Sequence, residues 1–395
     1  MKKIAIISYG GLPLPPVKGG AVENLIHTLV ENNETQKQAE LTVFSIYDEQ
    51  ACEEARKYKN TNFIYVSHRK RANAIAGLTN RIFRRLGFGA AFQVHPFLID
   101  LIDKLRKGNF DCVLVENRAE FMPYLRKKVS LPLYLHVHND HLCKDYFLAK
   151  KIYHSTDKFL AVSEYVKSRI LTIDDKSDKV AVLRNVIDVN HFMDVPQRVR
   201  QQMREQYHIG AEDTVFAFFG RITPSKGVGE LVSAFCKLAQ KHSNVKLLVV
   251  GAKWFGDNGE NAYMKQLREQ SQEVADKIIF TGYVDYPSIA QQYACADVVV
   301  VPSIAGEASA LVSMEAMASG KALIVSDSGG IHENVDATCA MEIPRGEGFV
   351  EGLAETMEQL VADQALQESM GKSGQSRAHI HDNKQYLSSL LELIG

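Results

Sequence analysis

Two glutamates eight positions apart, Glu307 and Glu315, are the residues whose spacing points most directly to chemistry. Glu307 lies in a short loop after the apolar run 297–302, and Glu315 lies on the first turns of the helix predicted to follow. Eight positions do not share one helix face, but a ligand across the helix N-terminus could touch both side chains. That N-terminus offers unpaired N–H groups and a partial positive charge, which suit a phosphate, and carboxylates suit vicinal hydroxyls. The stretch therefore predicts a pocket for a sugar nucleotide.

A second motif places two cations, Arg221 and Lys226, in a glycine-flanked loop between the strand-like run 214–219 and a predicted helix. Near a helix N-terminus such a pair would clamp a diphosphate, because charge-assisted hydrogen bonds contribute about 1.5–3 kcal/mol each. The alternative is a solvated basic loop, which the flanking glycines make less attractive. Further along, the backbone at Tyr283, just after another strand-like run, could pair with the edge of a nucleobase.

In the N-terminal half, Gly19 and Gly20 end a proline-rich loop between the first predicted strand and a helix predicted to begin near Ala21. Glycine lets the backbone approach a ligand closely, and the following helix offers its N-terminal dipole. A plain tight turn is the alternative. The loop lacks the GxGxxG fingerprint, so dinucleotide binding is not supported.

Two histidines, His136 and His138, alternate along a predicted strand and therefore point to the same face. His138 lies where the strand ends, so we expect it at the reaction centre as a hydrogen-bond partner of the sugar or the acceptor. A structural histidine is the alternative. Histidines at this spacing could bind a metal, but Asn139 and Asp140 complete no recognisable ligand set, so no metal site is expected.

Composition narrows the class of protein. The chain has 395 residues, which is long for one hydrophobic core, and its net charge of −1 gives no general reason to bind nucleic acid. The six cysteines are scattered without a CxxC pair, which predicts reduced thiols and a cytoplasmic protein. The first apolar run is too short for a signal peptide, and no run approaches the roughly 20 apolar residues of a membrane span.

One segment is strongly basic. Between Arg56 and Arg85 there are nine lysines and arginines, and no acidic residue occurs between Ala55 and Ile99. Such a segment could contact an anionic membrane surface, which would place the protein at the inner face of the membrane, or it could receive an anionic acceptor. A solvated loop and helix is the alternative.

Short apolar runs alternate with helical patterns along the chain, as is typical of parallel strands buried on both faces. The strand-like runs are residues 3–9, 41–45, 63–66, 111–115, 133–138, 159–162, 180–183, 214–219, 245–250, 278–280, 297–301 and 322–325. The pattern breaks near residues 185–197, a predicted linker, so we expect an α/β fold of two doubly wound, Rossmann-like domains facing a central cleft. The expected domains are 1–190 and 191–375, with a helix in 376–395 that packs back on the first domain.

Together these motifs resemble those of the retaining GT-B glycosyltransferases of family GT4, over nearly the whole chain. The Glu-x7-Glu element matches at Glu307 and Glu315, and the G-R-x4-K-G element matches at residues 220–227. The sequence GGAVE at residues 19–23 is similar to that of spore-coat and capsule glycosyltransferases. The usual Gly-Phe-Gly after the first glutamate is here Ala308-Ser309-Ala310, which restricts the φ angles of the loop.

The resemblance implies a role for each motif. Arg221 and Lys226 would bind the donor diphosphate, Glu315 would accept hydrogen bonds from the ribose, and Glu307 would contact the transferred sugar. Gly20 would let the first loop close on the donor, and His138 would face the transferred sugar. The other donor contacts would come from Gly19, Tyr283, Ser309, Ala310, Leu311 and Val312.

The resemblance also implies a reaction. A sugar would pass from a nucleoside diphosphate to an acceptor hydroxyl with retained configuration, by a front-face displacement in which the donor phosphate takes the acceptor proton. No metal or other cofactor would be needed, because fixed cations replace the missing DxD motif. A UDP-sugar is expected as the commonest donor, and a cell-surface glycan or lipid-linked precursor as the acceptor. The alternatives are a sugar-nucleotide epimerase or phosphorylase on this fold, or a catalytically inactive scaffold or coat protein.

Overall fold

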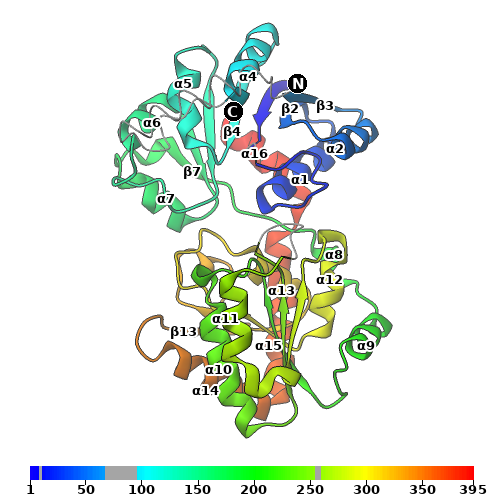
Figure 1. The fold of residues 1–395 in the computed structure, drawn as a ribbon. Coiled ribbons are helices and arrows are strands. Elements are labelled where there is room, and N and C mark those ends of the chain that lie inside the picture. Colours follow the sequence, from blue (N-terminus) through cyan, green and yellow to red (C-terminus); the bar gives the residue numbers. More distant parts are fainter. Residues whose placement is uncertain (9–10, 67–95, 254–258) are drawn as a thin grey trace. The chain divides into compact units, whose positions relative to one another are not determined.

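The computed structural model describes residues 1–8, 11–66, 96–253 and 259–395. These residues form two compact units (Figure 1): unit 1 consists of Met1–Arg184 and Lys384–Gly395, and unit 2 of Asn185–Asn383. The chain leaves unit 1 once and returns to it once, so unit 2 is continuous in sequence and unit 1 is not. The segment 376–395 is divided between the two units.

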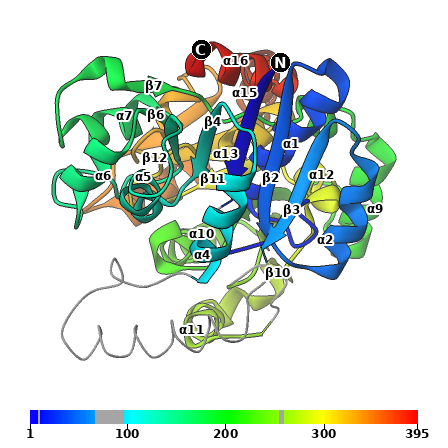
Figure 2. The ribbon, with the colours of Figure 1, turned by 90° about the horizontal axis from the view of Figure 1, so that it is seen from above.

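Unit 1 is built on a sheet whose described strands are all parallel, in the order β3-β2-β1-β4-β5-β6-β7. Figure 2 shows β2 and β3 side by side at one edge. The strands are β1 (Lys2–Ile7), β2 (Ala39–Ile46), β3 (Thr61–Val66), β4 (Cys112–Glu116), β5 (Leu133–Val137), β6 (Lys158–Ala161) and β7 (Val180–Val182). The described helices are α1 (Ala21–Gln36), α2 (Glu49–Glu54), α4 (Pro96–Lys107), α5 (Met122–Arg126), α6 (Ala149–Ser155), α7 (Glu164–Leu171) and α16 (Tyr386–Ile394).

Unit 2 repeats this plan with the strand order β10-β9-β8-β11-β12-β13, again parallel among the described strands. The strands are β8 (Thr214–Phe219), β9 (Val245–Val250), β10 (Ile278–Gly282), β11 (Val298–Val301), β12 (Ala322–Ser326) and β13 (Ala340–Ile343). The helices are α8 (Val189–Met193), α9 (Gln197–Gln206), α10 (Val228–Lys241), α11 (Ala262–Gln270), α12 (Tyr286–Cys295), α13 (Leu311–Ala318), α14 (Phe349–Ala362) and α15 (Gln364–Ala378).

The sequence of β8 shows why the sheet of unit 2 is buried on both faces. Phe216 and Phe218 belong to the apolar cluster that includes residues of α10 and α14, whereas Ala217 and Phe219 belong to the cluster that includes residues of α12 and α13. Alternate side chains of a strand point to opposite faces, so a continuous apolar run needs helices on both sides. This packing produces the layered α/β architecture that the sequence predicts.

The prediction of the linker was wrong in part. Residues 185–197 contain α8, whose Val189 and Phe192 are buried in the core of unit 2. Ile187 also forms a parallel bridge with Asp382 inside the same unit. The twelve predicted strands all overlap described strands, and β13 was not predicted.

The helix α16 completes unit 1 from a distant part of the sequence. It packs against α1, and its Leu387 N–H donates a hydrogen bond to Asn32 Oδ1 of α1 at 3.2 Å. The Lys2 ammonium, on β1, donates to the carbonyl of Ile394 at 2.7 Å. The buried residues of the helix are Tyr386, Leu387, Leu390 and Ile394.

Each sheet reverses its strand order at one point, between β1 and β4 in unit 1 and between β8 and β11 in unit 2. In open α/β sheets, ligands bind beyond the carboxyl ends of the strands at such a point. The loop after β1 carries Gly19 and Gly20, the loop after β8 carries Lys226, and the loop after β11 carries Glu307. The fold therefore places the predicted residues where such sheets hold their ligands.

Candidate functional site

The loop after β8 is tied to the loop after β11. It runs through a single turn, Pro224–Lys226, to Gly227 at the start of α10. The carbonyl of Ser225 accepts hydrogen bonds from the N–H groups of Ile304 and Ala305, at 3.0 and 3.2 Å. These backbone bonds bring the two predicted motifs of unit 2 side by side.

Lys226 and Glu307 form an ion pair at the carboxyl edge of the sheet of unit 2. The Lys226 ammonium donates to Glu307 Oε1, and the Ser303 hydroxyl donates to the same oxygen at 2.7 Å. The Lys226 side chain is 31% exposed and that of Glu307 is 14% exposed. Because an ammonium group has three donors, a lysine in this position can also bind an incoming anion.

The loop after β12 holds the main chain of Glu307. The Ser328 hydroxyl donates to the Ala305 carbonyl at 2.6 Å and accepts from the Glu307 N–H at 3.3 Å. The Gly330 N–H donates to the Glu307 carbonyl at 2.7 Å. Glu307 is therefore fixed at both main-chain polar groups, and its carboxylate projects from a defined position.

Glu315 lies in α13 and is buried. The Tyr293 hydroxyl, on α12, donates to Glu315 Oε2 at 2.7 Å, and the Tyr293 ring stacks on Phe219, the last residue of β8, with centroids 3.7 Å apart. Burial raises the pKa of Glu315 to about 7, and the hydrogen bond from Tyr293 opposes this rise. Glu315 therefore changes charge near neutral pH, and its charged form accepts hydrogen bonds strongly from hydroxyl groups.

The raised pKa of Glu315 makes stability depend on pH. Because its pKa in the fold, about 7, lies above its ordinary value of 4.5, its stabilising contribution is complete below about 4.5 and is lost as pH rises through about 7. We expect the free energy of unfolding of Glu315→Gln, relative to that of the wild type, to rise by on the order of 1–3 kcal/mol when the pH increases from about 5 to about 8. Chemical denaturation at both pH values measures this difference in the free energy of unfolding. Glu347→Gln, a substitution at an exposed position, is the control. An equal difference at both pH values would contradict the burial argument.

The other predicted residues of unit 2 surround this centre. Arg221 is exposed in the loop after β8, and Tyr283 is half-buried just after β10, where burial raises its pKa. The N–H groups of a first helical turn have no intrahelical partners, so the start of α13 suits an anion. The residues there are Ser309 and Ala310, just before the helix, and Leu311 and Val312, in its first turn.

In unit 1, the loop after β1 ends at Gly19 and Gly20, whose φ angles are 73° and 114°. Both angles lie in the region that favours glycine. A Cβ atom on Gly20 would lie 2.2 Å from the carboxylate of Glu23, which is buried in the first turn of α1. Burial raises the pKa of Glu23 to about 7. The backbone angle therefore favours glycine at position 20, and a Cβ atom there would also require the Glu23 side chain to shift.

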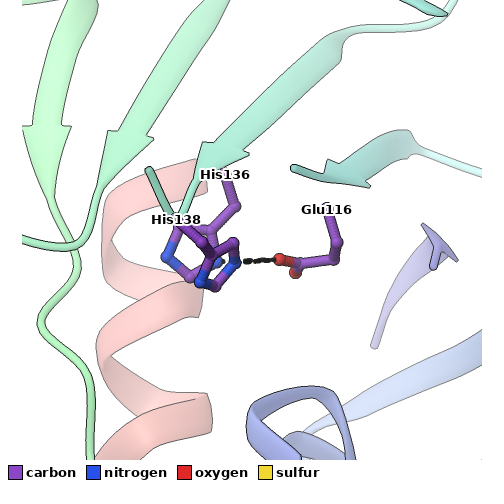
Figure 3. Close-up of side chains that lie close together, drawn as sticks. All are labelled: Glu116, His136 and His138. Carbon is purple, nitrogen blue, oxygen red and sulfur yellow. Dashed lines mark hydrogen bonds and ion pairs between the residues drawn. The ribbon is translucent and has the colours of Figure 1, made fainter. Parts of the chain in front are cut away.

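His138 lies in a cluster with His136 and Glu116 (Figure 3). Glu116 is the last residue of β4 and the register partner of His136 on β5, so the two side chains are neighbours, and His138 follows two residues later on the same face. Glu116 Oε2 lies 3.0 Å from His136 Nδ1 and 2.7 Å from His138 Nε2. The two histidines thus share one carboxylate oxygen.

The charges in this cluster follow from its burial and its contacts. Burial raises the pKa of Glu116, but the charge and hydrogen bonds of His136 and His138 outweigh this effect and bring the pKa to about 2. Burial, and then the charge of His136, lower the pKa of His138 to about 4 against the opposing effect of Glu116. At neutral pH, Glu116 is therefore a carboxylate and His138 a neutral imidazole.

Two groups of described residues bring donor atoms close enough together to hold a metal ion. One is Glu116 with His136 and His138, and the other, which is exposed, is Asp327 with His332 and Glu342. Two imidazole nitrogens and a carboxylate oxygen form a donor set that zinc accepts. The O···N separations of 2.7 and 3.0 Å in the first group are also ordinary hydrogen-bond distances. Hydrogen bonds therefore explain the close approach of these side chains without a metal ion.

Of the predicted residues, Lys226 and Glu307 are in direct contact. Glu315 makes its hydrogen bond with Tyr293 rather than with either of them. Gly20 and His138 belong to unit 1, so the two units each hold one part of the predicted site.

Comparison with known proteins identifies the family. Residues 199–377, which lie within unit 2 and include Lys226, Glu307 and Glu315, match the family model described as "Glycosyl transferases group 1". Residues 199–377 belong to the group 1 glycosyltransferases, and the chain is a glycosyltransferase. This glycosyltransferase is 26% identical to the putative glycosyltransferase YtcC of Bacillus subtilis over 388 residues, which cover 96% of this chain and 87% of the relative. It is 25% identical to the lipopolysaccharide 1,2-N-acetylglucosaminetransferase of Salmonella typhimurium over 339 residues, covering 85% of this chain and 83% of that one.

Solved structures share the fold of this glycosyltransferase. HepE of Anabaena, in complex with UDP and glucose, superposes with a TM-score of 0.77 at 19% identity, covering 100% of this chain and 99% of that one. Together with the two parallel sheets, this likeness confirms the predicted architecture of two Rossmann-like α/β domains of the GT-B type.

Sequence reasoning missed three side chains that contact the candidate site residues of the glycosyltransferase: Glu116, Tyr293 and Ser303. A carboxylate directly after the apolar run of β4 was the available signal for Glu116, because charge at the end of a buried strand needs a partner. Tyr293 gave no such signal, since it looks like one more apolar position of an amphipathic helix.

The basic segment of the glycosyltransferase between Arg56 and Arg85 is described only as far as Val66. The arginines at the centre of the expected membrane contact therefore lie outside the described residues. Within the described part of the chain, no helix combines the length and the apolar character needed to cross a membrane.

Proposed function

We propose that this glycosyltransferase transfers a sugar from a UDP-sugar to a hydroxyl of a cell-surface glycan or lipid-linked precursor, with retention of anomeric configuration. The observation that carries the proposal is the contact of Lys226 with Glu307 at the strand-order reversal of unit 2, in the same unit as the buried carboxyl of Glu315. The complexes of HepE with UDP and glucose and with UDP-glucose support the choice of donor. The Salmonella relative, named as a lipopolysaccharide transferase, supports the choice of acceptor.

In this proposal the bound diphosphate replaces Glu307 as the ionic partner of Lys226. Lys226 and Arg221 bind the diphosphate from the loop after β8, and the first-turn N–H groups of α13 contribute a favourable field. Glu307, relieved of its cation, accepts hydrogen bonds from hydroxyls of the transferred sugar. The ion pair of the free protein therefore keeps both side chains oriented until the donor binds.

The nucleoside is bound further along the same edge. Glu315 accepts hydrogen bonds from the ribose hydroxyls, and the backbone at Tyr283 pairs with the base. The hydrogen bond from Tyr293 to Oε2 fixes the carboxyl plane of Glu315, so the geometry is set before the ribose arrives.

The reaction breaks the bond between the anomeric carbon and the diphosphate and forms a bond from that carbon to the acceptor oxygen on the same face. The acceptor proton passes to the departing phosphate oxygen. Lys226 and Arg221 stabilise the negative charge that develops on the diphosphate. From unit 1, the loop at Gly19 and Gly20 closes on the donor and His138 faces its sugar.

The proposed reaction needs no metal or other cofactor, so turnover should persist in excess EDTA. The six cysteines are free thiols, which fits a reaction in the reducing cytoplasm, where we place the enzyme. The basic segment between Arg56 and Arg85 would bring it to the inner face of the membrane.

Isothermal calorimetry with UDP tests the nucleotide site. We expect Glu315→Ala to weaken UDP binding by about ten-fold or more, because a pair of charge-assisted hydrogen bonds is lost. The control is Glu347→Ala, which removes an exposed glutamate of the same unit. Unchanged affinity of the Glu315 variant would reject its role, and a thermal-shift screen of UDP, GDP, dTDP and ADP would show whether another base is preferred.

A further inference from the structure

The hydrogen bonds around Glu116 determine where protons lie in the cluster of unit 1. Glu116 Oε2 is within hydrogen-bond distance of two ring nitrogens, His136 Nδ1 and His138 Nε2. Each contact needs one proton between oxygen and nitrogen, and a protonated carboxyl could supply only one. A carboxylate oxygen that accepts from an N–H group of each ring satisfies both contacts at once, so the oxygen is the acceptor and both nitrogens are donors.

This arrangement fixes the ring of His138. A neutral imidazole has one N–H group and one lone pair, so an N–H at Nε2 leaves Nδ1 as a hydrogen-bond acceptor. The main chain is fixed as well, because the His138 N–H donates to Asn117 Oδ1 at 3.1 Å. Both anchors come from the end of β4 and the residue after it, and Figure 3 shows the His138 ring with its nitrogen turned toward Glu116.

The location argues against a purely structural role. A buried carboxylate is seldom stabilising compared with apolar packing, and here Glu116 Oε1 and His136 Nε2 are buried and have no hydrogen-bond partner among the described residues. The cluster lies at the carboxyl edge of the sheet, where β4 borders the strand-order reversal. Of the three side chains, His138 is the most exposed, at 5%.

We propose that Glu116 is a positioning residue that holds His138 in the Nε2–H tautomer, so that Nδ1 accepts a hydrogen bond from a ligand hydroxyl. His136 clamps the same carboxylate oxygen from the other side and keeps it aligned. The identity of the hydroxyl, one on the transferred sugar, rests on the proposed function, whereas the tautomer does not.

Nitrogen-15 NMR of the full chain, labelled at histidine, tests the tautomer without any activity assay. The His138 signals are assigned by their loss in His138→Gln. We expect a proton on Nε2 and none on Nδ1 at neutral pH, and a mixture of tautomers in Glu116→Gln. A proton on Nδ1, or the same tautomer in the variant, would overturn the proposal. So would a Zn²⁺ titration that shifts both ring signals at equimolar metal, because the nitrogens would then be ligands instead of donors.

A double-mutant cycle tests whether Glu116 acts through His138. With UDP-glucose as donor, we expect Glu116→Gln and His138→Ala each to lower turnover by about ten-fold or more, the effect of one lost hydrogen bond. The double variant should be no slower than His138→Ala, whereas multiplied effects would show that Glu116 acts independently and would reject the proposal. Glu40→Gln, an exposed glutamate on β2, is the matched control. If the wild type turns over no nucleotide sugar, the proposed function fails, and the NMR experiment still decides the tautomer.

Discussion

Lys226→Ala should lower the rate of sugar transfer by about 100-fold or more, the size of effect that follows removal of one donor to a developing oxyanion. In the proposed reaction, negative charge grows on the departing diphosphate, and Lys226 is the cation that the loop after β8 places beside Glu307. Its loss also leaves the Glu307 carboxylate, which is only 14% exposed and accepts a hydrogen bond from the Ser303 hydroxyl, without the positive charge of Lys226. That uncompensated charge would repel the phosphate.

The measurement is the rate of UDP release from UDP-glucose with and without acceptor, alongside UDP affinity by calorimetry. Because the charge develops in the transition state, the turnover number should fall by more than the affinity for UDP. Lys237→Ala is the matched control, since Lys237 also pairs with a glutamate of unit 2, Glu351, but both side chains are exposed. Turnover of the Lys226 variant close to that of the control would remove the electrostatic argument.

Gly227→Ala should destabilise unit 2 by about 2–5 kcal/mol and abolish donor binding. Gly227 has a φ of 72°, and a Cβ atom there would lie 1.8 Å from the carbonyl oxygen of Pro302. The backbone segments at Gly227 and Pro302 cannot easily move apart, because Ser225 and the residues after Pro302 are joined by backbone hydrogen bonds. Relief of the contact would separate Lys226 from Glu307.

A second glycine separates the cost of the left-handed backbone conformation from the cost of the close approach to Pro302. Gly348 has a similar φ of 81°, but a Cβ atom there would have no atom of the described residues within 4 Å beyond its immediate surroundings in the chain. Gly348→Ala should therefore cost only the left-handed backbone conformation, about 1–2 kcal/mol. Denaturation midpoints of both variants give the difference, and equal midpoints would show that the close approach to Pro302 is not important for stability.

The fold was largely predictable because the strands are continuous apolar runs. β11, with the sequence VVVV, has an obvious assignment, since such a run needs cover on both faces. β13 was missed because its AMEI sequence includes the exposed Glu342, which an edge strand with a single neighbour tolerates. The short helix α8 was missed because Asp188, which caps it, also suits a turn.

Part of the candidate site could be proposed from the sequence, where residue type alone limits the chemistry. Lys226 and Glu307 could be proposed because a cation and a carboxylate in loops after parallel strands have few structural uses. The partners of Glu315 and His138 were not found, because they depend on which side of a helix faces the sheet and on strand register. Register places Glu116 opposite His136, and no spacing within one segment encodes that pairing.

The late position of α16 in the sequence affects biogenesis. During translation, domains generally mature in order from the N-terminus. Here the ribosome makes all of unit 2 before it makes the helix whose Leu387 binds Asn32 and whose apolar face packs on α1. Unit 1 is therefore the first domain to be started and the last to be completed. Until α16 is synthesised, part of α1 stays uncovered while unit 2 forms its native core.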